Sequence, residues 1–226
     1  MQQLIQQLSQ VNPIDLILHI DQYLTLIITQ VGAWTYVLLF LVIFIETGLV
    51  ITPFLPGDSL LFAAGALTAL DNSPLDLYIL YLVVATAAVL GDTANYWIGK
   101  EIGPRVFTEK IPFLKKEYLD RTHTFYEEHG NITIFLARFI PIIRTFAPFV
   151  AGIGRMSYKH FLSYNIFGGI IWTALFVFGG HFFGNLPIVK NHFSFVLIAI
   201  ILISLVPAVV EYFQSRKKVI LSKQLE

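Results

Sequence analysis

Apolar residues dominate this chain in long runs that short polar segments separate. Three runs are long enough, at 1.5 Å per residue, to cross the ~30 Å hydrocarbon core of a bilayer as single helices. These runs are residues 77–99, 161–183 and 193–213. The pattern predicts an all-α integral membrane protein that forms one membrane domain over residues 1–226.

Two further apolar stretches are broken by prolines. The first covers residues 34–70, and its break consists of Pro53, Pro56 and Gly57. Each proline lacks an amide donor, so a continuous helix is improbable there. The part after the break begins with Asp58 and Ser59, which suit a helix N-cap, but it is too short to span a bilayer. We therefore expect a re-entrant hairpin, which is tolerated only where protein or a water-filled cavity shelters its free backbone groups.

The second broken stretch, residues 131–154, contains Pro141 and Pro148 and is expected to form a second re-entrant segment. The Phe-x-Pro of residues 139–141 and the Phe-x-x-Gly of residues 149–152 repeat those of residues 54–56 and 62–65, although the spacing between the two parts differs by two residues. Two hairpins that enter from opposite sides would form an inverted repeat, and paired interrupted segments of this kind are typical of a transporter's binding site near the bilayer midplane. Such short patterns also recur by chance in a chain that contains 20 Phe.

The remaining segments are polar or amphipathic. Residues 14–33 are predicted to form an amphipathic or half-buried helix, residues 100–130 a cytoplasmic amphipathic region, and residues 214–226 a basic tail. Six Lys or Arg lie between residues 100 and 121 and four lie in the tail. Because positive charge accumulates on the cytoplasmic side, both regions are placed in the cytoplasm. The side of the N-terminus stays open.

Composition narrows the function classes. Hydrophobic residues make up 56% of the chain and charged residues 13%, against roughly a quarter charged in soluble domains. Lys plus Arg equal Asp plus Glu at 15 each and cysteine is absent, so we expect no nucleic-acid partner, no disulfide and no cysteine-based metal site. The sequence lacks HExxH, GxSxG, P-loop and GxGxxG motifs. We therefore predict no enzyme activity, no metal, no cofactor, and transport driven by a gradient or by none.

Five ionisable residues lie within the apolar stretches. They are Glu46, Asp58, Asp92, Arg138 and Arg144. At a helix centre each costs roughly 2.5–3.5 kcal/mol, or on the order of 15 kcal/mol in total if all faced lipid, so they must face inward and find partners. With the two hairpins apposed, two carboxylates would meet two guanidiniums around a polar pocket. The alternative is an ion-pair network that only holds the hairpins together, although ionisable residues inside a membrane are functional candidates by default.

Residue chemistry assigns roles to four of these charges. A guanidinium binds phosphate bidentately and keeps its charge, so Arg138 and Arg144 suit an anionic headgroup. Burial raises the pKa of a carboxylate and a neighbouring cation lowers it. Together the two effects can bring the pKa into the range in which the group exchanges protons. Glu46 and Asp58 are therefore the candidate proton-coupling residues.

Three polar residues are candidates for supporting roles. Free amides near Asp58 and Ser59 could add an anion site at a helix start. Asp92 and Asn95 share one helix face, and the sequence leaves open whether they support the site or make a structural hydrogen bond.

Three long motifs carry a resemblance to a known family. They are ETGLVITPFLPGDSLLFAAG (46–65), GDTANYWIG (91–99) and HGNITIFLARFIPIIRTFAPFVAG (129–152). With these motifs the chain closely resembles the DedA family of bacterial inner-membrane proteins, relatives of the VTT-domain lipid scramblases, over residues 14–213. The resemblance implies two re-entrant hairpins that face each other and a role in moving lipids.

The resemblance also implies a substrate and site residues. Some family members are thought to return undecaprenyl phosphate to the cytoplasmic face with the proton motive force. Functionally required acidic residues of the family match Glu46 and Asp58, and its required arginines match Arg138 and Arg144.

The leading hypothesis is a multi-pass inner-membrane lipid transporter or flippase, coupled to protons, that moves a phosphate-bearing lipid and supports envelope integrity. The alternatives are a proton-coupled small-cation antiporter, which two fixed arginines disfavour, an uncoupled phospholipid scramblase, and a non-transporting scaffold. The GxxxG spacings at 99–103 and 180–184 allow a homo-oligomer but are too common to establish one.

Overall fold

The computed structural model describes residues 26, 28–49, 57–70, 73–102, 116–192, 195, 196 and 199. Within these ranges all regular structure is helical and there is no strand. Most of the predicted 14–33 and 193–213 helices, the tail 214–226, and both Pro53 and Pro56 lie outside the described residues.

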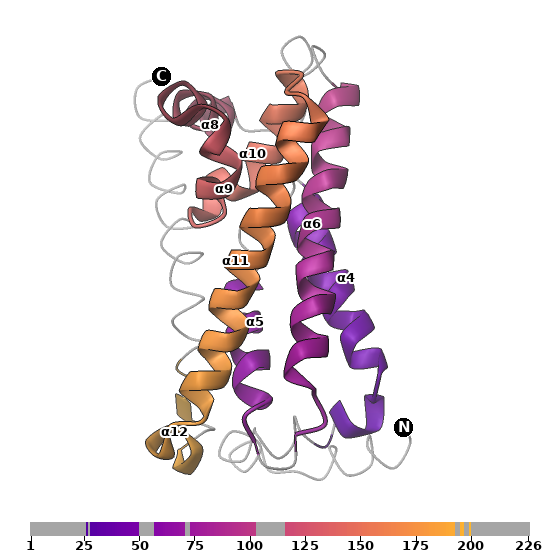
Figure 1. Ribbon diagram of the computed structural model, residues 1–226, viewed down its shortest axis with the longest axis vertical. Coiled ribbons are helices and arrows are strands. Elements are labelled where there is room, and N and C mark those ends of the chain that lie inside the picture. Colours follow the sequence, from indigo (N-terminus) through magenta and orange to yellow (C-terminus); the bar gives the residue numbers. More distant parts are fainter. Residues whose placement is uncertain are drawn as a thin grey trace, which may run out of the picture.

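Two long helices form the frame of the molecule. Helix α6 spans Leu77–Ile102 and helix α11 spans Tyr158–Gly184. They pack against each other and run along the longest axis (Figure 1). Both are long and apolar enough to cross a membrane.

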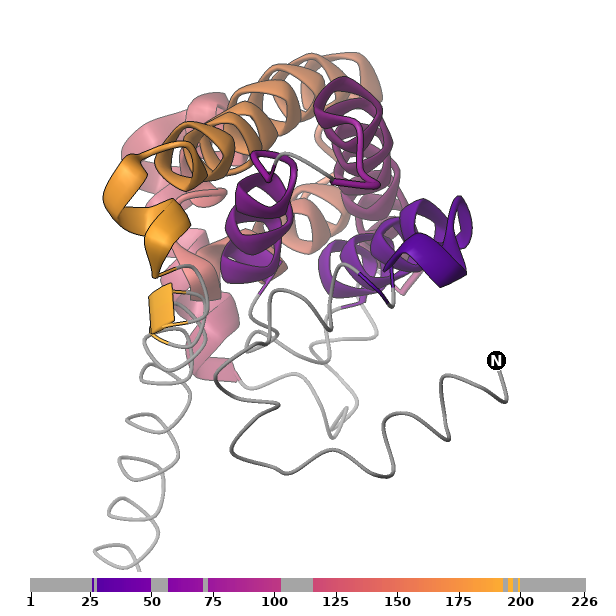
Figure 2. The ribbon, with the colours of Figure 1, turned by 90° about the horizontal axis from the view of Figure 1, so that it is seen from below.

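The first shorter pair of helices lies on one side of this frame (Figure 2). Helix α4, Trp34–Gly48, packs against α6, whereas helix α5, Gly57–Leu67, packs against α11. The α4–α6 contact is close because both helices have a glycine there: a Cβ atom on Gly48 would lie 3.4 Å from the Cα of Gly91. This crossing brings the C-terminal end of α4 beside the middle of α6.

A second pair of short helices packs against the same two long helices, but in the opposite order along the chain. Helix α9, Thr133–Ala137, follows the 3₁₀ turn Gly130–Ile132 and packs against α11, whereas helix α10, Pro141–Ile153, packs against α6. Figure 1 shows α5 and α10 in opposite halves of the molecule along its long axis.

Glycines bring α5 and α11 into backbone contact. A methyl group added to Gly65 would overlap the backbone carbonyl of Val177, and one added to Gly180 would overlap the carbonyl of Phe62. Phe62 and Gly65, the first and last residues of the Phe-x-x-Gly pattern, thus contact Gly180 and Val177, which lie three residues apart on α11.

Helices α10 and α6 cross with the same arrangement. A methyl group on Gly152 would overlap the carbonyl of Tyr96, and one on Gly99 would overlap the carbonyl of Phe149. Phe149 and Gly152, the first and last residues of the second Phe-x-x-Gly pattern, contact Gly99 and Tyr96, which lie three residues apart on α6. The two matching sequence patterns therefore make matching helix crossings.

Buried apolar side chains of the described residues form three clusters, and two of them lie along the length of the frame. One lies where α4, α5, α6 and α11 meet and includes Ile43, Leu61 and Trp172, and the other joins α6, α9, α10 and α11. Many large apolar side chains lie on the outside instead, with Trp34 70% and Phe182 72% exposed. A soluble monomer rarely exposes so much apolar surface, so this exterior suits contact with lipid.

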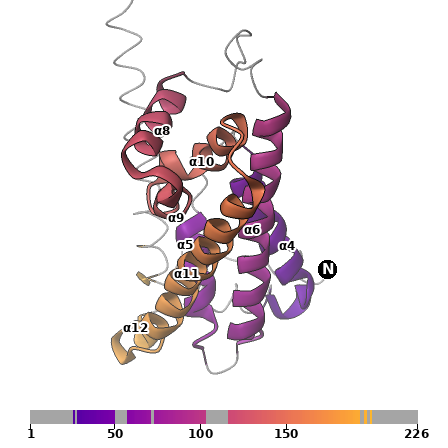
Figure 3. The same cartoon turned by 45° about the horizontal axis from the view of Figure 1, so that its top comes forward.

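Each end of the molecule carries a further helix. Helix α8, Lys116–His129, lies crosswise over the end that also holds α9 and α10 (Figure 3), and helix α12, Pro187–Asn191, lies at the other end. The Tyr126 hydroxyl donates to the Ala147 carbonyl at 2.9 Å and ties α8 to α10. Burial raises the pKa of Tyr126 above its ordinary value, and the charge of Asp92 adds to this effect, so the hydroxyl keeps its proton and the bond persists.

Candidate functional site

Arg144 joins the two broken segments. It lies in the first turn of α10, and its Nη1 donates to Oδ1 of Asp58 at 2.5 Å while its Nη2 donates to Oε1 of Glu46 at 2.5 Å. Arg144 and Glu46 are buried, with 8% and 3% of their side chains exposed, and Asp58 is 36% exposed. One guanidinium thus holds α4, α5 and α10 together. We call Glu46, Asp58 and Arg144 the Arg144 cluster.

The start of α5 is shaped to accept the Glu46 carboxylate. Oε2 of Glu46 lies against the backbone of Gly57, the first residue of α5, and any side chain at Gly57 would overlap that carboxylate. The free amides and the positive end of the helix dipole favour an anion at this position. Ser59 lies half-buried in the same turn.

Helix α11 contributes an aromatic surface to the Arg144 cluster. The Arg144 guanidinium lies 5.2 Å from the ring centroid of Trp172, which is fully buried. At this distance a cation is attracted to the face of the ring. Arg144, on α10, therefore contacts groups from three other helices, α4, α5 and α11.

Arg138 occupies a separate cluster. It follows α9 in the turn before Pro141, and its Nη2 donates to Oδ2 of Asp92 at 2.5 Å and to Oδ1 of Asn165 at 2.5 Å. The prediction that Arg138 would meet Glu46 and Asp58 is therefore wrong in its pairing. We call Asp92, Arg138 and Asn165 the Arg138 cluster.

Two glycines on α11 make space for the Arg138 side chain. A Cβ atom on Gly168 would lie 3.0 Å from Cδ of Arg138, and one on Gly169 would lie 3.5 Å from its Nη2. The guanidinium is therefore directed across α11 toward Asp92 and Asn165, which explains why it does not join the Arg144 cluster.

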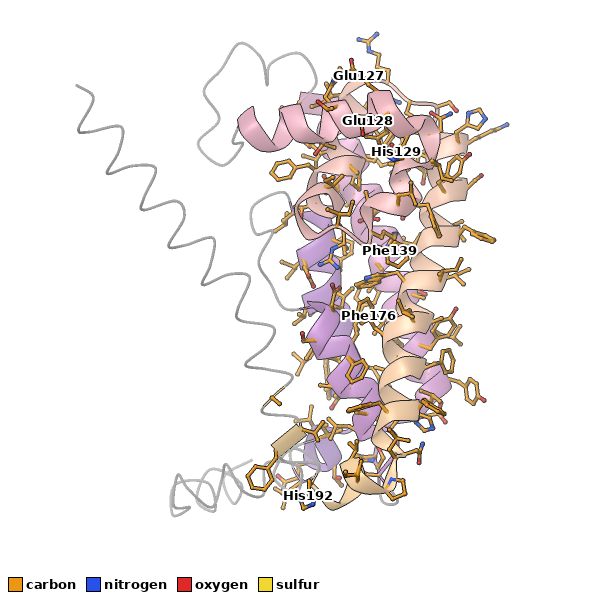
Figure 4. All side chains as sticks on the ribbon, turned by 90° about the vertical axis from the view of Figure 1, so that its left-hand side faces the viewer. Glu127, Glu128, His129, Phe139, Phe176 and His192 are labelled. Carbon is orange, nitrogen blue, oxygen red and sulfur yellow. The ribbon has the colours of Figure 1, made fainter. Side chains whose placement is uncertain are left out.

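The two clusters lie close enough to influence each other. Asp92 interacts electrostatically with Arg144 as well as with Arg138, and the two guanidiniums repel each other. Phe139 lies in the break between α9 and α10, directly after Arg138. Figure 4 shows Phe139 away from both ends of the molecule, so this break lies along the length of the molecule and not at an end. The five charges that the sequence singled out thus lie in two neighbouring groups, in which all but the partly exposed Asp58 are buried.

Asn95 supports the site through the backbone. Its Nδ2 donates to the carbonyl of Thr47 at 3.1 Å and to the carbonyl of Thr145 at 2.9 Å. Although Asn95 and Asp92 share a helix, these two bonds do not involve Asp92. Asn95 instead connects α4, α6 and α10 next to both arginines.

Pro148 does not break the second stretch, contrary to the sequence prediction. Helix α10 begins at Pro141 and continues through Pro148 to Ile153. The missing amide of Pro148 leaves the carbonyl four residues earlier, that of Arg144, without its helical donor. The carbonyl next to it, that of Thr145, accepts the amide of Asn95, which ties the turn before Pro148 to α6.

Sequence reasoning missed two residues of the site. Asn165 was overlooked inside the apolar stretch 161–183, where an amide needs a buried partner and is therefore a signal. Trp172 carried no signal, because a tryptophan in a spanning helix is ordinary. Both lie on α11, the helix that had no ionisable residue in its apolar core.

Comparisons with known proteins agree on one family. The VTT domain model matches residues 55–182. Protein DedA of Escherichia coli (strain K12) is 48% identical over 205 residues, which cover 90% of this chain and 94% of that protein. An uncharacterized membrane protein of Mycobacterium tuberculosis (strain ATCC 25618 / H37Rv) is 46% identical over 75% of both chains.

A more distant relative extends the comparison. Inner membrane protein YqjA of Escherichia coli (strain K12) is 33% identical over 154 residues, which cover 68% of this chain and 69% of that protein. No solved structure matches the chain.

Proposed function

This chain belongs to the DedA family of VTT-domain membrane proteins, close to DedA itself, and from this premise we propose that it is a proton-coupled transporter of a phosphate-bearing lipid such as undecaprenyl phosphate. The observation that carries the proposal is the Arg144 cluster. A cation that can bind phosphate is held by two carboxylates that can bind protons, so a phosphate competes with the carboxylates for Arg144, and a proton competes with Arg144 for each carboxylate.

The mechanism follows from this competition. While Glu46 and Asp58 are charged, they occupy both ends of the Arg144 guanidinium. Protonation removes their charge and weakens both bonds, because charge-assisted hydrogen bonds are about twice as strong as neutral ones. Arg144 is then free to bind a phosphate oxygen, and Arg138 supplies a second cation nearby. Release of the lipid restores the ion pairs and returns the protons.

The helix arrangement supports a transport pathway of the alternating type. We propose that α5 and α10 are the inner arms of two re-entrant hairpins that enter from opposite sides. They lie in opposite halves of the molecule (Figure 1) and make matching glycine crossings with α11 and α6. In such an inverted repeat, one hairpin can open while the other stays closed around a site between them.

The orientation of the protein follows from charge. We place α8 and its end of the molecule at the cytoplasmic face of the bacterial inner membrane, because the basic residues of 100–121 lie in α8 or before it in the sequence, and positive charge accumulates on that side. The basic C-terminal tail is placed on the same side. Helix α12 then lies at the opposite face.

The antiporter alternative is weakened by the geometry. Both carboxylates that would have to coordinate a small cation already bind one guanidinium. A cation entering the Arg144 cluster would meet that positive charge, whereas an anionic phosphate would be attracted to it.

The proposal is tested by lipid movement in proteoliposomes. Labelled undecaprenyl phosphate and labelled phosphatidylethanolamine would be followed with and without an imposed pH gradient, for the wild type and for Arg144→Ala. We expect gradient-stimulated movement of the polyprenyl lipid that requires Arg144. Equal movement of both lipids, independent of the gradient, would instead make the protein a scramblase and remove Glu46 and Asp58 from a proton role.

A control variant separates loss of the site from loss of charge in general. Asp76 precedes α6 and its Oδ1 accepts the backbone amides of Tyr78 and Ile79 at 2.9 and 2.8 Å. Because asparagine caps helices as well as aspartate does, Asp76→Asn removes one negative charge far from the clusters and should transport like the wild type.

A further inference from the structure

Arg138 has hydrogen-bond donors that the described residues do not satisfy. A guanidinium carries five N–H groups, and only Nη2 of Arg138 donates to Asp92 and Asn165. Nε and Nη1, which carry the other three, are buried and have no hydrogen-bond partner in the part of the chain that the structure describes. The side chain is 2% exposed. Buried donors normally have a hydrogen-bond partner, so these N–H groups of Arg138 are available to bind a further acceptor.

The two arginines differ in how much negative charge holds them. Arg144 contacts two carboxylates, Glu46 and Asp58, whereas Arg138 contacts one carboxylate, Asp92, and the neutral amide of Asn165. An incoming anion therefore competes with a single carboxylate at Arg138 and with two at Arg144. The Arg138 cluster is the easier place for a phosphate to bind first.

The interior charges do not balance. Three carboxylates and two guanidiniums leave one net negative charge when all are ionised. Among the residues that the structure describes, the other groups that contact or sense these charges are neutral: Asn165 and Trp172 on α11, and Tyr126 on α8, which senses the charge of Asp92. A singly charged phosphate entering this site would raise the net charge to minus two. Such an excess is costly in a low-dielectric interior, and two bound protons would neutralise it.

We propose that Asp92, Arg138 and Asn165 form the phosphate subsite, that the phosphate binds Nε and Nη1 of Arg138, and that its binding takes up protons. A monoanionic phosphate requires two protons for neutrality, and Asp92 receives one of them because it loses its ion pair as the phosphate arrives. Asp92 is then a third proton-binding residue beside Glu46 and Asp58. The choice of phosphate as ligand rests on the proposed function.

The experiment measures proton uptake on lipid binding. Binding of dihexanoyl phosphatidylglycerol to the detergent-purified full chain would be followed by titration calorimetry in two buffers that differ in ionisation enthalpy. This phosphodiester keeps one negative charge across the working pH range, so protons taken up must go to the protein. Zwitterionic dihexanoyl phosphatidylcholine and inorganic phosphate serve as comparison ligands.

We expect the wild type to take up between one and two protons per phosphatidylglycerol. Its affinity for this lipid should then fall roughly tenfold for each proton bound when the pH is raised by one unit. Asp92→Asn mimics the protonated residue, so uptake should fall by about one proton and binding at pH 8 should tighten roughly tenfold. Asn165→Asp gives Arg138 a second carboxylate, as Arg144 has, and should weaken binding at pH 8 while binding recovers at lower pH. Asp76→Asn should match the wild type.

Three results would overturn the inference. They are no preference for phosphatidylglycerol over phosphatidylcholine, binding without proton uptake, and uptake that Asp92→Asn leaves unchanged. If Asp92→Asn does not fold, as judged by size-exclusion profile and thermal unfolding, the pH profile of Asn165→Asp decides instead. Equal binding of inorganic phosphate would overturn the assignment to a lipid headgroup.

The inference can fail separately from the proposed function. Proton-linked phosphatidylglycerol binding without lipid movement in proteoliposomes would keep the subsite and remove the transport role. Lipid movement without proton uptake at Asp92 would do the opposite.

Discussion

At the scale of single residues, the two arginines have different environments although the sequence presents them alike. Arg144 donates to two carboxylates and faces a tryptophan, whereas Arg138 donates to one carboxylate and one amide and has further donors with no partner among the described residues. Arg144 therefore depends on the planar, forked shape of the guanidinium, which lysine does not share.

Arg144→Lys should impair transport although it keeps the charge. One ammonium on a flexible stem cannot hold Glu46 and Asp58 in the fork geometry and stack on Trp172 together. Arg144→Ala should also destabilise the protein, by about 3–5 kcal/mol, because it leaves the buried Glu46 carboxylate unpaired. Lipid movement in proteoliposomes and thermal unfolding in detergent measure the two effects. Wild-type transport by Arg144→Lys would show that charge alone suffices.

Gly57→Ala should disturb the Glu46 carboxylate directly. The added methyl group would overlap that carboxylate. The carboxylate must then move away from the start of α5, and its bond to Arg144 weakens. A double-mutant cycle on thermal unfolding with Glu46→Ala isolates this effect, since Gly57→Ala should cost much less once the carboxylate is gone. Equal costs in both backgrounds would mean that the methyl group acts elsewhere.

At the scale of helices, the sequence predicted where the second stretch breaks but not where it continues. Pro141 starts α10, because proline has the backbone angle of a first helical residue and no amide to lose there. Pro148 looked equivalent in the sequence, yet the helix continues through it with Asn95 of α6 on a carbonyl of the preceding turn. This contact comes from a residue about fifty positions away, which a local pattern does not reveal.

Gly180→Ala should separate α5 from α11. The new methyl group would overlap the backbone carbonyl of Phe62, whereas a methyl group on neighbouring Gly179 would lie 3.9 Å from the ring of Phe62, an ordinary contact. Overpacking of this kind costs about 1–3 kcal/mol, while Gly179→Ala gains roughly 0.5–1 kcal/mol of helix propensity. Thermal unfolding of both variants checks the prediction. The account of the crossing is contradicted if the two variants unfold alike.

At the scale of the molecule, the sequence was sufficient for the membrane class and the family but not for the site's division into two clusters. Apolar runs and long motifs identified a helical membrane protein of the DedA family. The five interior charges were also recognised. Their pairing depends on which long helix each short helix crosses, and the Arg138–Asp92 pair in particular depends on space left by Gly168 and Gly169. The re-entrant hairpins and the inverted repeat stay predictions.

The proposed orientation can be checked by labelling single cysteines. The chain contains no cysteine, so Glu127→Cys on α8 and His192→Cys after α12, which lie at opposite ends of the molecule in Figure 4, provide unique exposed thiols. A membrane-impermeant maleimide applied to intact spheroplasts should label His192→Cys only, and inverted membrane vesicles should give the opposite result. Labelling of both from one side would contradict the placement of these ends on opposite faces.

The central claim is that proton binding by the Arg144 cluster drives lipid movement. The most direct measurement is the rate at which labelled undecaprenyl phosphate moves in proteoliposomes under an imposed pH gradient, for the wild type and for Glu46→Gln and Arg138→Ala variants shown to be folded and inserted. The account predicts that the gradient accelerates the wild type, that Glu46→Gln loses this acceleration, and that Arg138→Ala moves little lipid at all. Movement by both variants as fast as the wild type would contradict it.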